Sequence, residues 1–285
     1  MFSLGPEVER IVDGALAEDV GWGDLTTEAL VPPQYQGKAS ILVKGRGVLA
    51  GIEVALLTFL RTDPSLAVEI LVPDGSPVEP GTVAATVGGS MASILKAERT
   101  ALNFLGRLSG IASATADYVQ AISGTSGRII DTRKTVPGLR LLDKYAVRMG
   151  GGKNHRLHLG DGVLIKDNHL EAMASKGGSL ADAVQRARDR SSHMIKVEVE
   201  VESLEQAREA LASGADLILL DNMKVEEMRE VVKELHGRVP TEASGGIRLQ
   251  NVRSIAETGV DYLSVGALTH SVQALDVSLD LVAAE

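Results

Sequence analysis

Short β-rich apolar runs alternate with helical segments in the second half of the chain. From residue 128 onward the runs are RIID, GVLIKD, IKVEVEV, DLILLD, TEASG and YLSVG. This alternation predicts βαβ units and a parallel sheet. The segment SGADLILLDN at 213–222 also resembles TGVDYLSVGA at 258–267, since each combines a glycine helix stop, an aspartate and an apolar strand. Repeated units of this kind favour an α/β barrel over an open sheet.

The first half of the chain has a different pattern. After an early helix, ASILVKGRGVLAG and AVEILVPDGSPVEPGTVAATVG contain short apolar runs separated by turns rich in Gly and Pro. These runs predict short antiparallel strands and a separate α+β domain over residues 1–112. A long helix with an apolar stripe follows, and the α/β domain is expected over 113–270. We also predict a helix over 271–285 that completes the first domain.

Composition limits the classes of partner. The chain has 285 residues and no cysteine, which excludes disulfides and thiolate chemistry and is typical of a cytoplasmic protein. A net charge of -9 and only eight aromatic residues (one Trp, four Tyr, three Phe) argue against nucleic-acid binding. The longest apolar stretch, VLAGIEVALLTFL, is too short to span a bilayer, and the first residues lack a secretory signal pattern. We therefore expect neither a nucleic-acid nor a membrane partner.

Basic residues concentrate between positions 131 and 169 of this acidic chain. They are Arg133, Lys134, Arg140, Lys144, Arg148, Lys153, Arg156 and Lys166. A positive island in a negative field favours a small, multiply charged anion. A solvated helix face is the alternative interpretation of such a charge run. Several of these charges, however, follow apolar runs or a triple glycine, where a loop-borne site would be built.

Polar residues follow each of the predicted parallel strands. In such sheets, function sits at the carboxyl ends of the strands. The residues at these ends are Asp131, Thr132, Arg133, Lys134, Lys166, Asp167, Asn168, His169, Glu198, Glu200, Asp221, Asn222, Ser244, Gly245, Gly246 and Gly266. The segment SGG at 244–246 precedes a helix-like segment, so it predicts a phosphate cradle made of backbone N–H groups and a helix end. Gly266 predicts the second half of that cradle.

Carboxylates and cations in these positions allow two kinds of chemistry. Glu198 and Glu200 lie on one face of a predicted strand, and with Asp221 they either hold Mg²⁺ or form salt bridges to nearby Arg and Lys. The two interpretations are compatible. The residues Arg133, His155, Arg156 and Lys166 are candidate ligands for carboxylates and phosphates. A lone histidine such as His155 is also often structural.

Several motifs in this order resemble a known family. They are EDVGWGDLTTEALVP at 18–32, ERTALNFLGRLSGIAS at 98–113, DTRKTVPGLR at 131–140, GGGKNHRLHLGDGVLIKDNH at 150–169, EVEVESLEQA at 198–207, LLDNM at 219–223, and ASGGIRLQNV with YLSVGALTHS. The chain is similar to the quinolinate phosphoribosyltransferases, also called nicotinate-nucleotide pyrophosphorylases (carboxylating). The resemblance implies an N-terminal α/β sandwich and an incomplete seven-stranded α/β barrel. It also implies a homodimer or an assembly of dimers.

The resemblance further implies a reaction and a set of site residues. A type II phosphoribosyltransferase of this family joins 5-phosphoribosyl 1-pyrophosphate to quinolinate with decarboxylation, giving nicotinate mononucleotide for NAD biosynthesis, pyrophosphate and CO₂. By the family's motifs, quinolinate is bound by Arg133, His155, Arg156 and Lys166, and by Arg99 supplied across the dimer interface. The catalytic positions are Lys134, Lys166, Glu200 and Asp221, and the last two hold Mg²⁺. Ser244, Gly245, Gly246 and Gly266 match the 5-phosphate site.

Three other functions are compatible with parts of the pattern. A paralogous group associated with molybdenum transport shares the fold and opening motif, with a different substrate or a non-enzymatic role. The KNHR and KDNH patterns at 153–156 and 166–169 favour the transferase over this group. An aldolase using Lys166 as a Schiff-base amine and a nucleotide-binding regulatory protein are the remaining alternatives.

Overall fold

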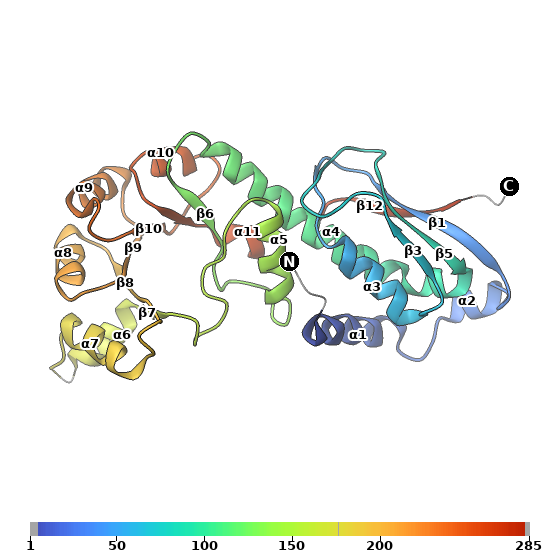
Figure 1. Ribbon diagram of the computed structural model, residues 1–285, viewed down its shortest axis with the longest axis horizontal. Coiled ribbons are helices and arrows are strands. Elements are labelled where there is room, and N and C mark those ends of the chain that lie inside the picture. Colours follow the sequence, from blue (N-terminus) through green and yellow to red (C-terminus); the bar gives the residue numbers. More distant parts are fainter. Residues whose placement is uncertain (1–4, 176, 283–285) are drawn as a thin grey trace. The chain divides into compact units, whose positions relative to one another are not determined.

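The computed structural model describes residues 5–175 and 177–282, which form two compact units (Figure 1). The first unit contains the chain up to Ala116, residues 135–151, and the chain from Leu268 onward. The second contains residues 117–134 and 152–267. The first unit thus includes α5 (Arg140–Met149). The domain boundary at residue 112 that the sequence predicts would instead place this helix in the barrel domain. None of the described helices is long and apolar enough to span a membrane.

The first unit is built on a four-stranded antiparallel sheet. Its strand order is β12 (Val277–Val282), β1 (Gln36–Val43), β5 (Val83–Ser90) and β3 (Ala67–Ile70). Alternate residues of β1, namely Ala39, Ile41 and Val43, are fully buried and join the same apolar core as residues of α3 (Ile52–Thr62) and α4 (Met91–Ala121). The other elements are α1 (Pro6–Val20), α2 (Leu25–Leu30), and the pair β2 (Gly47–Val48) and β4 (Pro77–Val78). The antiparallel strands predicted for this half are therefore confirmed.

The helix predicted over 271–285 is wrong. Residues 277–282 form β12, which pairs antiparallel with β1 so that Val277 opposes Val43 and Leu279 opposes Ile41. The sequence VSLDLV alternates apolar and polar residues, and Val277 and Leu279 pack on the apolar core. That two-residue period fits a strand with one buried face. Residues 283–285 lie outside the described part of the chain.

The second unit contains a six-stranded parallel sheet. Its strands are β6 (Arg128–Ile130), β7 (Val163–Ile165), β8 (Val197–Val201), β9 (Leu217–Asp221), β10 (Thr241–Ser244) and β11 (Tyr262–Ser264). Each of the six predicted runs is one of these strands. The helices of the connections are α6 (Asp167–Ala174), α7 (Leu180–Arg190), α8 (Leu204–Ala212), α9 (Val225–Leu235) and α10 (Val252–Ala256), and α11 (Ala267–His270) follows β11.

The strand order is that of a barrel with one open seam. Strand β11 pairs back onto β6, giving the order β6-β11-β10-β9-β8-β7, so the seam lies between β6 and β7. At the free edge of β6, Ile130 makes a single parallel bridge with Lys153. The α/β barrel is confirmed, but its seventh strand position is this bridge rather than a strand, because the glycines at 150–152 and the polar residues after them provide no apolar run to extend it.

Strand alternation decides which side chains enter the barrel. Val197, Val199 and Val201 of β8 are almost completely buried on the face covered by α7 and α8. Their neighbours Glu198 and Glu200 therefore point to the barrel interior. The glutamates are in this position because the valines bury apolar area on the opposite face.

Candidate active site

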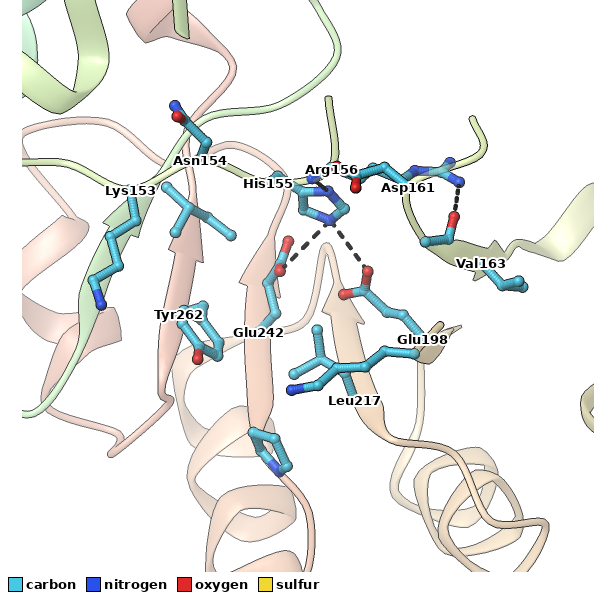
Figure 2. A pocket seen from close by; sticks show the side chains of 14 residues that line it. Lys153, Asn154, His155, Arg156, Asp161, Val163, Glu198, Leu217, Glu242 and Tyr262 are labelled. Atoms are coloured by element: carbon cyan, nitrogen blue, oxygen red, sulfur yellow. Dashed lines mark hydrogen bonds and ion pairs between the residues drawn. The ribbon is translucent and has the colours of Figure 1, made fainter. Parts of the chain in front are cut away.

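A histidine and two glutamates meet inside the barrel (Figure 2). The Nε2 atom of His155 lies 3.1 Å from Oε2 of Glu198 on β8 and 3.8 Å from Oε2 of Glu242 on β10. The side chains of Glu198 and Glu242 are 7% and 1% exposed, and that of His155 is 13% exposed. This cluster therefore forms a largely buried polar floor inside the barrel.

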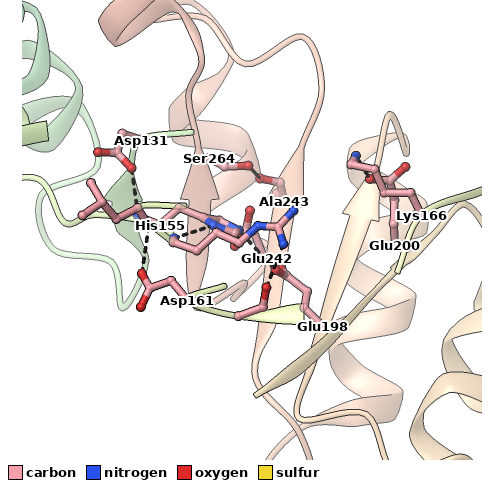
Figure 3. Close-up of polar contacts among 12 residues, drawn as sticks. Asp131, His155, Asp161, Lys166, Glu198, Glu200, Glu242, Ala243 and Ser264 are labelled. Carbon is pink, nitrogen blue, oxygen red and sulfur yellow. Dashed lines mark hydrogen bonds and ion pairs between the residues drawn. The ribbon is translucent and has the colours of Figure 1, made fainter. Parts of the chain in front are cut away.

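Asp131 fixes the loop that carries His155. This carboxylate directly follows β6 and is completely buried. Its Oδ1 accepts a hydrogen bond from the backbone N–H of His155 at 2.8 Å (Figure 3). Its Oδ2 accepts one from Nδ2 of Asn154 at 2.7 Å. Two bonds to a charged acceptor hold the loop against the end of the strand. The imidazole is thereby placed above the glutamates before any substrate arrives.

Two guanidinium groups lie near this floor. Arg156 donates from Nη1 to the carbonyl oxygen of Gly162 at 2.7 Å. Burial, and secondly the like charge of Arg133, lower the pKa of Arg156. The Nε atom of Arg133 is buried and has no hydrogen-bond partner among the described residues. A pair of partly desolvated cations with an unused donor fits a ligand with carboxylate groups.

Lys166 and Glu200 form an ion pair at the ends of β7 and β8, where Nζ of Lys166 donates to Oε2 of Glu200 (Figure 3). On the next strand, Oδ2 of Asp221 accepts a hydrogen bond from Nδ2 of Asn222 at 2.6 Å. Asn222 has a φ of 53°, and its backbone N–H donates to the carbonyl oxygen of Ser244 at 2.9 Å. Polar contacts thus link the end of β7 to that of β8, and the end of β9 to that of β10.

The donor set of Glu200 and Asp221 fits Mg²⁺. Both are carboxylates at the ends of neighbouring parallel strands, and each has one oxygen engaged by a neighbouring side chain. Mg²⁺ prefers oxygen ligands and usually retains waters and substrate phosphates, so two carboxylates are a sufficient protein contribution. Among the described residues these two are not part of a cluster of three potential metal ligands, so the ion would depend on water and substrate for its remaining ligands.

The glycines after β10 have the conformations of a tight cradle. Gly245 has a φ of 92°, and a Cβ atom there would lie 2.2 Å from Oδ1 of Asn222; Gly246 has a φ of 60°. Only glycine fits Gly245 without displacing the end of β9. Gly266 lies between the last residue of β11 and the first of α11.

The helix end expected at this cradle is not there. Helix α10 begins only at Val252 and has five residues. Between the cradle and the helix, Oδ1 of Asn251 accepts from the N–H of Arg248 at 2.7 Å, and Nδ2 of Asn251 donates to the carbonyl of Gly246 at 3.1 Å. Such side-chain bonds offer the backbone an alternative to helix. The cradle therefore consists of backbone and Ser244 alone.

Not all predicted site residues meet in the second unit. Arg133, His155, Arg156 and Glu198 are close together, and Lys166 pairs with Glu200. Lys134 is exposed just after Arg133, with its backbone N–H bonded to Oγ1 of Thr132 at 3.0 Å. Arg99 belongs to the first unit, where it is exposed and lines a cavity of about 360 Å³ with residues that include Asp19, Asp24, Leu25 and Lys96.

Sequence reasoning did not identify Glu242. This residue lies in TEASG, which the pattern predicts as a strand, and only its position inside a buried strand marks it as unusual. A cavity of about 360 Å³ lies on its side of the barrel and is lined by His155, Glu198 and Glu242 together with residues nearer the strand starts, among them Lys196, Leu217, Pro240 and Tyr262 (Figure 2). A charged residue in a buried strand is rare enough to have served as a signal.

Comparisons with known proteins agree over nearly the whole chain. The models of the quinolinate phosphoribosyl transferase N-terminal and C-terminal domains match residues 24–109 and 111–280. The chain is 42% identical to a probable nicotinate-nucleotide pyrophosphorylase [carboxylating] of Bacillus subtilis (strain 168), covering 96% of this chain and 93% of the relative. It is 47% identical to a nicotinate-nucleotide pyrophosphorylase [carboxylating] of Mycobacterium leprae, covering 94% of each. The crystal structure of NadC from Streptococcus pyogenes superposes with a TM-score of 0.94 at 40% identity, covering 100% of both chains.

Proposed function

Because the chain belongs to the quinolinate phosphoribosyltransferase family, we propose that the residues around His155 and Lys166 form the site of its reaction. The enzyme transfers the phosphoribosyl group of 5-phosphoribosyl 1-pyrophosphate to quinolinate and removes one carboxylate. The products are nicotinate mononucleotide, pyrophosphate and CO₂, and the pathway is NAD biosynthesis. With no cysteine in the chain, we expect the enzyme to work in the cytoplasm.

The observation that carries the proposal for quinolinate is the pair of guanidinium groups beside an anchored histidine. Arg133 has a buried, unused Nε donor, and Arg156 is partly desolvated next to it. A pyridine dicarboxylate presents two planar anionic groups, which arginine binds through parallel hydrogen bonds. His155, held by Asp131, defines the depth to which the ring can enter. The ring nitrogen is thereby oriented for attack.

The phosphoribosyl half fits the strand ends on the other side. Lys166, with Lys134, neutralises charge on the departing pyrophosphate, and the backbone at Ser244, Gly245 and Gly246, with Gly266, receives the 5-phosphate. Glu200 and Asp221 face the ribose, where carboxylates stabilise an oxocarbenium-like centre. A bound Mg²⁺ would be held by these two acids and would stabilise the charge of the pyrophosphate.

The second step is the loss of the 2-carboxylate. Once the ring nitrogen carries ribose, it is positively charged. The bond between C2 and the carboxylate breaks, CO₂ leaves, and the electron pair stays on C2 beside the cationic nitrogen. A proton then joins C2. The buried floor made by His155, Glu198 and Glu242 bounds the site of this reaction from below.

We also propose a homodimer in which Arg99 acts in the site of the partner. Arg99 is exposed, and it shares its cavity with Leu25. Leu25 is 82% exposed, and Trp22 and Leu30 nearby in the sequence are also largely exposed. Large apolar side chains exposed together are typical of an interface. On such an interface, the guanidinium group of Arg99 would reach the anion-binding site of the partner subunit.

Subunit mixing tests the shared site. An Arg99→Ala chain and a Lys166→Ala chain are each expected to be inactive. After exchange, roughly half of the dimers are mixed, and each has one intact site, so about a quarter of the activity should return. Mixing two preparations of Lys166→Ala is the control. No recovery after proven subunit exchange would show that Arg99 acts within its own chain or not at all.

Product analysis tests the reaction itself. The purified protein is incubated with Mg²⁺, 5-phosphoribosyl 1-pyrophosphate and either quinolinate or nicotinate. We expect nicotinate mononucleotide and an equal amount of CO₂ from quinolinate alone, and at least a hundredfold loss in Lys166→Ala. Product from nicotinate would contradict the decarboxylating assignment. Full activity after exhaustive chelation would contradict the role of Mg²⁺.

A further inference from the structure

We infer that Glu242 is a neutral carboxylic acid that positions His155 in the active site. This inference rests on the proposed function, because it concerns the residue that bounds the quinolinate pocket from below. Glu242 does not touch the mouth of the barrel. It acts through the imidazole, whose Nε2 lies 3.8 Å from its Oε2.

Glu242 has an environment that does not support a charge. Its side chain is 1% exposed, and neither carboxyl oxygen has a hydrogen-bond partner among the described residues. The hydroxyl of Ser264 donates to the carbonyl oxygen of Ala243 at 3.2 Å, and it lowers the pKa of Glu242 by less than burial and Glu198 raise it (Figure 3). An ionised carboxylate buried without donors is among the costliest groups in a protein. A protonated acid at this position avoids most of that cost.

The negative charges around Glu242 also favour its neutral form. The groups that face or share its pocket are Asp131 after β6, Glu198 on β8, Tyr262 on β11, and Lys153, His155, Arg156, Asp161 and Lys196 on the connecting segments. Burial comes first and the negative charge of Glu198 second in raising the pKa of Glu242 well above its usual value. None of the cationic groups makes a hydrogen bond to Glu242 in the described part of the chain.

Neutrality at Glu242 has a consequence for quinolinate. Nε2 of His155 is 3.1 Å from one carboxylate, that of Glu198, which satisfies it. A second negative charge 3.8 Å away would pull the imidazole downward and repel a dianionic substrate held by Arg133 and Arg156. As a neutral acid, Glu242 fills the space beneath the ring without adding this charge. The pocket then keeps the positive potential that a dicarboxylate requires.

A cation is the alternative way to neutralise the two glutamates. The ligand atoms of His155, Glu198 and Glu242 all lie within 4.8 Å of one another, which is close enough to hold a metal ion. A metal at this position would occupy Nε2 of His155 and leave both glutamates charged. The proton and the metal therefore predict opposite charge states for Glu242, and the two are separable by experiment.

The test compares wild type with three Glu→Gln variants. Glu242→Gln replaces the neutral acid with a neutral amide of the same shape, Glu198→Gln removes the charge that His155 contacts, and Glu230→Gln on the exposed face of α9 is the matched control. The specificity constant kcat/KM for quinolinate is measured as a function of pH. In Glu242→Gln we expect kcat/KM to fall on the alkaline side at a pH at least one unit higher than in wild type. Above the wild-type midpoint, this shift corresponds to a kcat/KM about tenfold higher than that of wild type. Glu230→Gln should follow wild type, and Glu198→Gln should lose activity at every pH.

Carbon-13 NMR of the glutamate carboxyl groups in the folded protein provides a reading that does not depend on turnover. One carboxyl should titrate well above the others, and it should be absent from Glu242→Gln. Three results would each overturn the inference. They are titration of every glutamate in the ordinary pH range, coincident pH profiles of wild type and Glu242→Gln, and a stoichiometric metal ion in wild type that is lost in Glu242→Gln. Failure of the proposed function would show separately, as the absence of nicotinate mononucleotide from wild type.

Discussion

Replacing Asp74 with alanine should destabilise the first unit strongly. This carboxylate accepts hydrogen bonds from the backbone N–H of Gly51 at 2.9 Å, the N–H of Ile52 at 3.0 Å and the hydroxyl of Tyr145 at 2.6 Å. The two amides open helix α3 and are buried. Leaving a buried donor without a partner costs about 1–3 kcal/mol, and some loss is recovered by water because Asp74 is half-buried. We expect a loss of about 3 kcal/mol in the free energy of unfolding.

Urea denaturation followed by circular dichroism measures this loss. A change of that size should also lower the Tm by roughly 6–12 °C in a protein of this length. Tyr145→Phe removes only one of the three bonds, so it should cost about 1 kcal/mol, and Asp74→Asn should fall between the two variants. A loss below about 1 kcal/mol for Asp74→Ala would refute the reasoning, since it would mean that water replaces the carboxylate at both amides.

Three other predictions concern both units. Arg107→Ala removes two of the three hydrogen bonds that buried Asp143 accepts, those at 3.0 and 2.9 Å, so unfolding in urea should reveal a loss of about 3–5 kcal/mol. Gly245→Ala should raise KM for 5-phosphoribosyl 1-pyrophosphate at least tenfold, because the new Cβ would overlap Asn222; an unchanged KM would place the phosphate elsewhere. The raised pKa of Glu242 stabilises the folded state fully below the usual pKa of 4.5. That contribution is lost as pH rises through the folded-state pKa, by up to about 1.4 kcal/mol per pH unit, and Glu242→Gln should lack this slope in pH-dependent denaturation.

The six barrel strands could be predicted from the sequence because each is a short apolar run between turn signals. The C-terminal strand could not, for a physical reason. Its residues VSLDLV have the alternation of a strand, but a helical pattern also fits the wider segment from residue 271. Pairing with β1, more than 200 residues earlier in the chain, decides between them. Such a long-range contact leaves no local signal.

The residues of the candidate site that stand out by their charge could be predicted from the sequence. Arg133, Arg156 and Lys166 differ from the acidic remainder of the chain, so their clustering was visible in the sequence. The contribution of Glu242 could not be predicted, because it depends on which face of β10 points into the barrel and on a histidine from a different segment. The start of α10 was equally hidden, since the bonds of Asn251 that delay it depend on turn geometry.

The Lys166–Glu200 ion pair and the His155–Glu198 contact differ in how easily they can change partners. The side chain of Lys166 is 44% exposed, so its contact with Glu200 is worth about 0–1 kcal/mol, and exchanging that carboxylate for a substrate phosphate costs little. His155 and Glu198 are 13% and 7% exposed, and separating them would leave buried polar atoms without a partner, at a cost of about 1–3 kcal/mol. Under the proposed function, the floor of the pocket is therefore a fixed template for the pyridine ring. Under the same proposal, the mouth of the pocket can release one anion and accept another, which is what a transferase that binds and expels pyrophosphate requires.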